Sequence, residues 1–496
     1  MNRHSQVRAG RWSSVSAVLL ALSSLIAAQG ITAVPAKAAE VISALVTDVA
    51  SDTTPAVPGG QCYPGVPDPS ACRRVLDLLH VSSAAGNWIY VAGIISSVLD
   101  RASGVTVGGF HNIFRYDAAT HVVDKTWKPQ FYKTLTTYTD APVTGLAVSP
   151  DGSELYAAGG FSQVAPTTGA AGVQRKGVAE VSTTDGSILP FNARVCTGGG
   201  GCVVNDVQVV NGMLWLAGLF SHVNGVAINA LAFVDPNSGN LGATQLPISG
   251  IVTTTVGTKV VKIAVNNQST QAVIIGNFST VGSATHKEVA VLDISADGTA
   301  LANPWNAPTN LDASETACSA KDTWARGVDW DPSGTFFDIA ASGGGGFDAY
   351  PGLCDSFSRF KSDGNPSTPF PLVVNATGFD SEFTVCDTGS YAYVGGHFKS
   401  QNHVVRINGV KKSLSGRASE THYGMATLSM DTTDPNYGFA VKAWNNSSLT
   451  GRGAGWASCL GLGGGGSSGG GVYIGGDAEN VNGDATIQRL AYVPAP

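Results

Sequence analysis

A short apolar block rich in glycine, YAYVGGHF at Tyr391–Phe398, recurs along the chain and decides the fold. Clear copies are found at Trp88–Gly93, Leu155–Phe161, Leu214–Phe220, Val273–Phe278 and Val472–Gly476. A degenerate copy, FFDIAASG, lies at Phe336–Gly343. The seven copies stand roughly 60 to 80 residues apart, and a repeated spacing of this kind indicates an architecture built from repeats.

Each copy of the block has the same neighbours. An alternating strand that ends in a tight turn precedes it, as in VTGLAV before Ser149–Gly152, and a third strand follows it, as in ALAFVD before Pro236–Gly239. Asn-Gly, Asp-Gly and Ser-Gly pairs in the turns supply the positive φ that hairpins require. A fourth, shorter piece often carries a tryptophan, and we expect Trp127, Trp305 and Trp444 to pack between repeats rather than against a ligand.

Four antiparallel strands in each of seven units predict an all-β fold, a seven-bladed β-propeller. A sandwich needs about seven strands in all, whereas the repeats here provide about four times that number. The last repeat stops after its third strand, and Val41–Val49 is a spare strand near the other end of the chain. We expect that segment to complete the last blade and close the ring, because unpaired strand edges invite aggregation. The propeller is predicted as one domain over residues 39–496.

The composition agrees with many short strands joined by turns. Of the 496 residues, 13% are charged, 43% are hydrophobic and 62 are glycine. The charged fraction is about half of the roughly 25% that is average for globular proteins. A formal net charge of −7 argues against a nucleic-acid partner, which would need clustered Lys and Arg.

The first 38 residues predict export. Three arginines precede an apolar run over about residues 15–28, and Ala36–Ala38 has the small-x-small pattern of a cleavage site. No later run reaches the ~18 apolar residues that a membrane-spanning helix needs. We therefore predict a signal peptide over residues 1–38 and a secreted, extracellular protein without a membrane span. A single membrane-spanning helix in this first segment is the alternative.

Eight cysteines follow the predicted signal peptide, and an even number in an exported protein predicts disulfides. They are Cys62, Cys72, Cys196, Cys202, Cys318, Cys354, Cys386 and Cys459. Cys62 and Cys72 bracket a short loop rich in Pro and Gly, and Cys196 and Cys202 bracket a run of glycines, so these two pairs are expected first. Cys318 with Cys354, and Cys386 with Cys459, would make up the remainder. A zinc site is the alternative, but no two cysteines have the close spacing of zinc ligands.

The chain contains none of the common catalytic motifs: no G-x-S-x-G elbow, no H-E-x-x-H helix and no Walker phosphate loop. We predict no catalytic residue, no metal site and no cofactor. A ligand of a propeller is expected at the mouth of the central channel, a concave place between repeated units. Alignment of the strands on their turns places there the predicted ligand-binding residues Asn205, Asp206, Lys262, Arg326 and Glu382, together with Thr144 and Ser381.

The charges of this predicted rim allow two interpretations. Asp206 and Glu382 could form an acid/base pair, and Lys262 and Arg326 could hold an anionic or carbonyl group. Alternatively, the four charges neutralise one another. Opposite charges so close would keep the two carboxylates ionised and lower their pKa values, whereas a general acid needs a raised pKa. We therefore expect Asp206 and Glu382 to be structural or to orient a ligand.

The order of these pieces resembles the delta-60 type propeller repeat of secreted bacterial proteins. The resemblance rests on the aromatic-x-Pro piece, the alternating strand, the Asp-Gly turn and the Tyr-Val-Gly-Gly-x-Phe block, and covers about residues 75–493. The fifth copy lacks the aromatic residue after its glycines, and the seventh has Asp477 in its place. The family resemblance implies an extracellular binding or scaffold module and supplies no catalytic residues.

The expected function is thus that of a secreted, non-enzymatic propeller that binds an extracellular polymer or a partner protein. One alternative is an extracellular polysaccharide hydrolase or lyase with carboxylates at the channel mouth. Another is a purely structural component of an appendage or coat. The sequence assigns no oligomeric state.

Overall fold

The computed structural model describes residues 53–58, 73–133, 141–196, 203–252, 257–305, 324–343, 353–363, 371–377, 381–396, 398–413, 420–421, 424–441, 471–475 and 490–494. All of them belong to one compact unit, residues 35–496. Every regular element among them is a β-strand. None of the described segments is an apolar helix of membrane-spanning length. Val41–Val49, the expected closing strand, lies outside the described residues.

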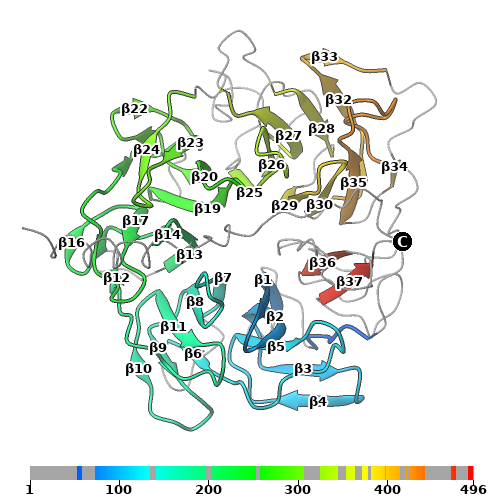
Figure 1. Cartoon of the computed structure of the whole chain (residues 1–496). Helices are drawn as coiled ribbons and strands as arrows, with labels where there is room; N and C mark the ends of the chain where they lie inside the picture. The colour runs from blue at the N-terminus through cyan, green and yellow to red at the C-terminus, as the bar shows by residue number, and fades with distance from the viewer. Residues whose placement is uncertain are drawn as a thin grey trace, which may run out of the picture. The chain divides into compact units, whose positions relative to one another are not determined.

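Six antiparallel sheets follow one plan in chain order (Figure 1). The first three are β1–β2–β5 (Arg74–Ser83, Gly86–Ile94, Ile113–Asp117), β7–β8–β11 (Val143–Val148, Glu154–Gly159, Val178–Ser182) and β13–β14–β17 (Val203–Val210, Met213–Leu219, Leu231–Val234). The fourth is β19–β20–β23–β24 (Lys259–Val265, Gln271–Asn277, Val289–Ile294, Ala300–Ala302). The fifth begins β25–β26–β27–β28 (Trp324–Trp330, Phe336–Ser342, Ser356–Lys361, Val373–Ala376), and the sixth is β29–β30–β35 (Glu382–Asp387, Tyr391–Gly396, Met425–Ser429). A further pair, β36–β37 (Gly471–Gly475, Leu490–Pro494), follows. The predicted all-β, antiparallel class is confirmed.

The fourth strand of the repeat is shorter than the sequence suggests. It is a full strand in sheets 4 and 5 but a single antiparallel bridge in the other four, at Val123, Ile188, Leu241 and Ala440. Sheet 5 instead extends to six strands, because β28 also pairs with β32 (Val404–Ile407), which pairs with β33 (Val410–Lys411). Short edge strands of this kind offer few free backbone groups to another chain.

Small sheets connect each of the first three repeats to the next. The hairpin after the second strand pairs with the segment that arrives from the preceding repeat: β9–β10 with β6 (Gln163–Ala165, Val173–Gln174, Gln130–Tyr132), β15–β16 with β12 (His222–Val223, Val226–Ala227, Val195–Cys196) and β21–β22 with β18 (Thr280–Val281, Ala284–Thr285, Ile248–Ser249). Two other small pairs are β3–β4 (Ser97–Asp100, Val105–Gly108) and β31–β34 (Ser400–Gln401, Glu420–Thr421). These pairings fix the order of neighbouring repeats.

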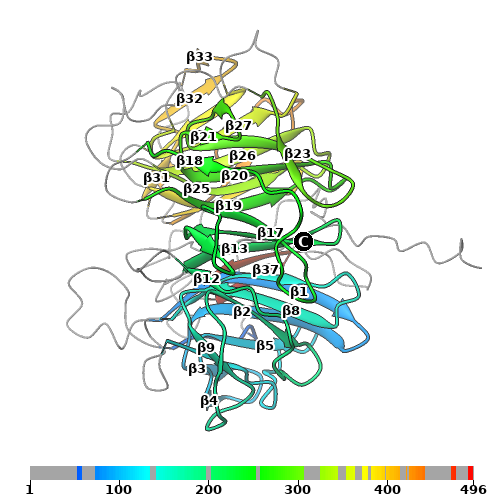
Figure 2. The ribbon, with the colours of Figure 1, turned by 90° about the vertical axis from the view of Figure 1, so that its left-hand side faces the viewer.

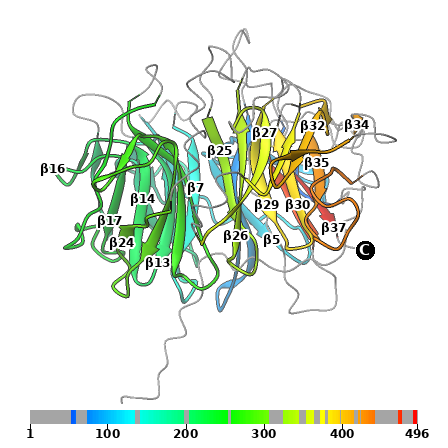
Figure 3. The ribbon, with the colours of Figure 1, turned by 90° about the horizontal axis from the view of Figure 1, so that it is seen from above.

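The first strands of successive sheets lie next to each other. Strand β1 contacts β7, β7 contacts β13, β13 contacts β19, β19 contacts β25 and β25 contacts β29. Figure 2 shows β19, β20 and β25 side by side, and Figure 3 shows first and second strands such as β13, β14, β25 and β26 running along roughly one direction. Strand β36 contacts β1.

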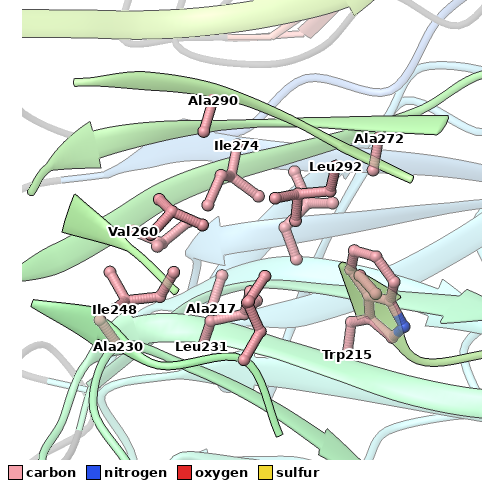
Figure 4. Packing of buried hydrophobic residues seen from close by; sticks show 14 of the residues in the cluster. Trp215, Ala217, Ala230, Leu231, Ile248, Val260, Ala272, Ile274, Ala290 and Leu292 are labelled. Carbon is pink, nitrogen blue, oxygen red and sulfur yellow. The ribbon is translucent and has the colours of Figure 1, made fainter. Parts of the chain in front are cut away.

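Apolar faces of neighbouring sheets make the cores. One cluster joins Trp215 and Leu231 of sheet 3 to Val260, Ile274 and Leu292 of sheet 4, all buried (Figure 4). Full burial of each such side chain stabilises the fold by about 1.5–3 kcal/mol relative to exposure.

Indole groups add a directional contact to this packing. Trp127 and Trp305 are buried, and each donates its Nε1–H to a carbonyl oxygen of the following sheet, at Ser182 (2.9 Å) and Lys361 (3.0 Å). The prediction that these two tryptophans pack between repeats is confirmed, whereas Trp444 lies outside the described residues. A buried tryptophan that finds an acceptor in the neighbouring sheet fixes how the two sheets face each other.

A β-bulge near the start of each first strand explains the glycine in the recurring block. The register slips there in all six sheets, for instance between Val143 and Gly145 in β7. The bulge brings a carbonyl oxygen against the second strand: a Cβ on Gly159 would lie 2.1 Å from the oxygen of Pro142, and a Cβ on Gly93 would lie 2.0 Å from that of Arg74. Gly218, Gly276 and Gly396 meet the same obstacle at 2.2–2.3 Å. At these five positions only glycine fits, since the obstacle is backbone, whereas sheet 5 has Ala341 at the corresponding position.

We predict that Gly159→Ala destabilises the protein by about 2–3 kcal/mol, because the methyl group must displace a strand. Gly108→Ala is the control, since a Cβ there has no heavy atom within 4 Å and the φ of Gly108 is not in the left-handed region. Urea unfolding of the two variants tests this, and equal midpoints for both would contradict the role given to the bulge.

Candidate functional site

The residues that the sequence predicted as ligand-binding lie at or next to the bulges of the first strands. Asn205 and Arg326 are the extra residues of two bulges, Asp206 and Lys262 directly follow a bulge, and Glu382 directly precedes one. The alignment of the repeats therefore placed all five at equivalent levels of their strands. The structure also shows which of them contact one another.

Asp206 and Lys262 come together, with a partner that the sequence analysis missed. Lys262 Nζ lies 3.2 Å from Asp206 Oδ1 and 3.9 Å from Asp77 Oδ1. Both carboxylates are fully buried, and the lysine side chain is 21% exposed. Gly145, on the strand between β1 and β13, leaves room for this convergence, since a Cβ there would lie 3.1 Å from Asp206 Oδ1.

The same two carboxylates hold the sheets together. Asp77 Oδ2 accepts the backbone N–H of Leu146 in the next sheet, and Asp206 Oδ2 accepts that of Ile263 in the sheet after its own, each at 2.8 Å. Asp329 repeats the contact between sheets 5 and 6, where its Oδ2 accepts the N–H of Asp387 at 2.9 Å. Charge-assisted bonds to backbone N–H groups are stronger than neutral ones. These aspartates therefore link the sheets.

Lys262 remains protonated in this setting. Desolvation disfavours its charged form, but the carboxylates of Asp206, Asp77 and Asp329 outweigh that effect and raise its pKa. A lysine held in this way cannot act as a base near neutral pH. Its ammonium group neutralises buried carboxylates, which fits the interpretation of the rim as mutually neutralising charges.

Asn205 and Arg326 do not join this group. Asn205 donates from Nδ2 to the carbonyl oxygen of Val260 in the next sheet at 2.9 Å. Arg326 donates from Nε to Ser342 Oγ at 2.9 Å, and its guanidinium lies 5.9 Å from the ring centre of Phe383. The described contacts of both residues are thus structural, within a sheet or between sheets.

Glu382 is the exception among the predicted residues. It is fully buried, its Oε1 accepts Gln401 Nε2 at 2.8 Å, and its Oε2 has no hydrogen-bond partner. Desolvation raises the pKa of Glu382 to about 8, and the charge of Asp355 acts in the same direction. The expectation that a nearby positive charge lowers this pKa is wrong, because none of the described cations forms an ion pair with Glu382.

A second buried charge cluster, between sheets 5 and 6, was missed by the sequence analysis. Arg359 donates from Nε and Nη2 to the two carboxylate oxygens of Asp338, each at 2.8 Å, and from Nη2 also to Asp387 Oδ2. All three side chains are at most 4% exposed. Burial raises the pKa of Asp338, and raises that of Asp387 further above its ordinary value. An aspartate inside the apolar FFDIAAS block was the available signal.

A pocket of about 400 Å³ opens beside this cluster. It lies between turns of sheets 5 and 6, and its lining residues are Asp331, Phe336, Arg359, Gly389, Ser390, Met430, Asp431, Thr432 and Tyr437. The lining combines two aromatic rings with carboxylates and a guanidinium. Such mixed lining is typical of sites that hold a polar organic ligand by a few hydrogen bonds.

One prediction about the cysteines, that all eight form disulfides, is wrong. Cys386 is a free, buried thiol in β29, so the expectation that all eight cysteines pair, with Cys386 bound to Cys459, is wrong at Cys386. In a packed strand a free cysteine behaves as a small apolar side chain. Cys354 is disulfide-bonded. The pairs Cys62–Cys72, Cys196–Cys202 and Cys318–Cys354 each include a residue outside the described ranges and stay predictions.

Comparison with known proteins assigns no family. No family model matches the chain, and no curated protein matches it. Among solved structures, hydrazine synthase of Kuenenia stuttgartiensis is similar over 70% of this chain and 80% of its own, with 14% identity and a TM-score of 0.36. A chain of the mitotic checkpoint complex is similar over 91% of this chain and 99% of its own, with 12% identity and a TM-score of 0.41. Both TM-scores are below 0.5, so neither likeness bears on fold or function.

We predict that Lys262→Met destabilises the protein by about 2–3 kcal/mol, because it leaves buried carboxylates without their counter-charge. Adding Asp206→Asn should recover part of that loss, since the amide oxygen still accepts the Ile263 N–H without a charge. Urea unfolding of the single and double variants measures both effects. A double variant less stable than Lys262→Met would contradict the electrostatic explanation.

Glu382 makes stability depend on pH. Its pKa is raised from 4.5 to about 8 in the folded chain. Between these two pH values the carboxyl group is protonated in the folded state and ionised in the unfolded state. The free energy of unfolding therefore falls as the pH rises through this range. Glu382→Gln should match the wild type near pH 4.5 and exceed it increasingly toward pH 8, with about 1.4 kcal/mol as the limit for each pKa unit. Urea midpoints in buffer with a chelator measure this, and a difference independent of pH would contradict it.

Proposed function

We propose that this chain is a secreted, non-enzymatic seven-bladed β-propeller that binds an extracellular polymer or a partner protein. The contacts of each first strand with the next, in chain order, support a ring of blades. The contact of β36 with β1 supports closure between the last repeat and the first. The seven sequence repeats and the family resemblance point the same way.

The observation that carries the non-enzymatic part of the proposal is that the carboxylates of the predicted rim serve as structural contacts between sheets. Asp77 and Asp206 accept backbone N–H groups of neighbouring sheets and share one lysine. Both carboxylates are fully buried, so a substrate in solution does not reach them. Glu382 has the raised pKa that a general acid needs, but it is fully buried, and a proton donor must reach the reacting group.

The pocket beside Arg359 is the place proposed for the ligand. Thr432 and Ser390 lie at its edge in exposed or half-exposed turns. Two aspartates fix the guanidinium group of Arg359, so the pocket has a rigid polar group in its lining. Preorganised polar groups beside aromatic rings favour recognition of a hydroxyl-rich or amide-rich chain.

The test compares binding with turnover. Purified protein without residues 1–38 is incubated with a panel of polysaccharides, and both retention by the polymer and release of reducing ends or unsaturated products are measured. We expect retention on at least one polymer without turnover. Thr432→Trp should abolish retention by filling the pocket, whereas Asn237→Trp, in the corresponding turn of sheet 3, should leave it unchanged.

The alternative, a polysaccharide hydrolase or lyase, has its own outcome in this assay. Wild-type turnover that is lost in Asp206→Asn or Glu382→Gln would replace the proposed binding function by an enzymatic one. Retention that survives Thr432→Trp would exclude the pocket as the binding place.

A further inference from the structure

A pair of buried valines recurs in the first four repeats. One is the first-strand residue that pairs with the glycine of the second strand: Val75, Val143, Val204 and Val260. The other comes five residues after that glycine: Val98, Val164, Val223 and Val281. In every case both valines belong to the same hydrophobic core and are fully buried.

The sixth repeat replaces both valines by polar residues. Glu382 pairs with Gly396 in the first position, and Gln401 comes five residues after Gly396 in the second. Both side chains are fully buried. They share one hydrogen bond, Gln401 Nε2 to Glu382 Oε1 at 2.8 Å, and Glu382 Oε2 and Gln401 Oε1 have no partner. Two apolar side chains have thus been exchanged together for one carboxylate and one amide.

A second carboxylate contacts the residue next to Glu382. Ser381, the neighbour of Glu382, donates from Oγ to Asp355 Oδ1 at 3.2 Å. Asp355 is itself buried, and its charge acts on Glu382. Burying a carboxylate without a counter-charge costs several kcal/mol, and an unpaired buried oxygen adds to that cost. A buried group in this position requires a ligand, a proton or a trapped water to explain it.

We propose that Glu382 and Gln401, with Asp355, form a binding site for a calcium ion inside the sixth repeat. Every atom that the three side chains offer to an ion is an oxygen, from two carboxylates and one amide, which is the ligand type that Ca²⁺ prefers. The ion supplies the positive charge that the described residues do not bring to Glu382. It also links β29 to β31 and to the segment before β27, where the other repeats use apolar contact. The proposal does not depend on the proposed function.

The sequence alone does not predict this site, because the spacing of its ligands along the chain matches no metal-binding motif. Asp355, Glu382 and Gln401 come from three separate segments, and one of them is a glutamine. Among the described residues no group of three or more His, Cys, Asp or Glu side chains could hold a metal. Only the comparison of repeats, position by position, shows that two core valines have been exchanged.

Equilibrium dialysis of the full chain against about 1 mM Ca²⁺, a concentration typical for extracellular calcium modules, tests the proposal. The double variant Glu382→Val/Gln401→Val restores the valine pair of the other repeats and should fold. We expect it to bind one Ca²⁺ per chain fewer than the wild type. The thermal unfolding midpoint should rise with Ca²⁺ in the wild type, not in the double variant, and Mg²⁺ should have a smaller effect because it requires a more rigid octahedral site.

Glu180→Gln is the matched control. Glu180 is a buried carboxyl in β11 whose pKa is raised to about 7 by desolvation, and it has no contact with this site. It should bind as much Ca²⁺ as the wild type. Glu382→Gln, which keeps the shape of the side chain, should lose the same ion as the double variant. Equal binding by the wild type and Glu382→Gln, or no binding by the wild type, would overturn the proposal.

Discussion

The β-bulge at the start of each first strand is the constraint on which the rest of this structure depends. It adds one residue to the strand, so a carbonyl oxygen moves to within 2.0–2.3 Å of where a Cβ of the second strand would lie. In five of the six sheets that residue is glycine, which explains why the glycine block recurs, whereas sheet 5 has Ala341 there. A bulge also increases the local twist and redirects the side chains that follow it. In this chain it turns Asp77, Asp206 and Lys262 toward the neighbouring first strands.

Two buried clusters of charged residues lie where sheets meet. Lys262 neutralises Asp77 and Asp206 beside β1, β13 and β19, and Arg359 joins Asp338 to Asp387 between sheets 5 and 6. Buried ion pairs of this kind add little net stability, because desolvation offsets most of the attraction. They do select one arrangement, since a sheet that shifted by one residue would leave a charge unpaired. Together with the indole bonds, they align apolar faces that would otherwise fit in several ways.

This use of charge bears on function. Asp77 and Asp206 are buried and each accepts a backbone N–H of another sheet, so both are held in fixed positions. The features left for ligands are the pocket beside Arg359 and the oxygen-rich cluster at Glu382, both near sheet 6. Sheet 6 therefore departs from the repeated plan more than sheets 1–4 do. In a repeat protein, a departure that replaces buried apolar residues is the place where a specific role is expected.

The sequence by itself determined the all-β class, the repeated unit and the level on each first strand at which the predicted ligand-binding residues lie, because strand alternation, turn glycines and a close backbone contact are local requirements. It also determined that Trp127 and Trp305 pack inside, since equivalent places in a repeat share one environment. Only the tertiary structure decided which rim residues meet. Asp77 of β1 reaches Lys262 of β19 although two first strands, β7 and β13, stand between them in the order of contacts, and Glu382 meets Gln401 instead of a cation. Cys386, counted as half of a disulfide, is a core thiol. The partners of a side chain come from segments far apart in the chain, and their distances depend on how sheets pack, which no local pattern encodes.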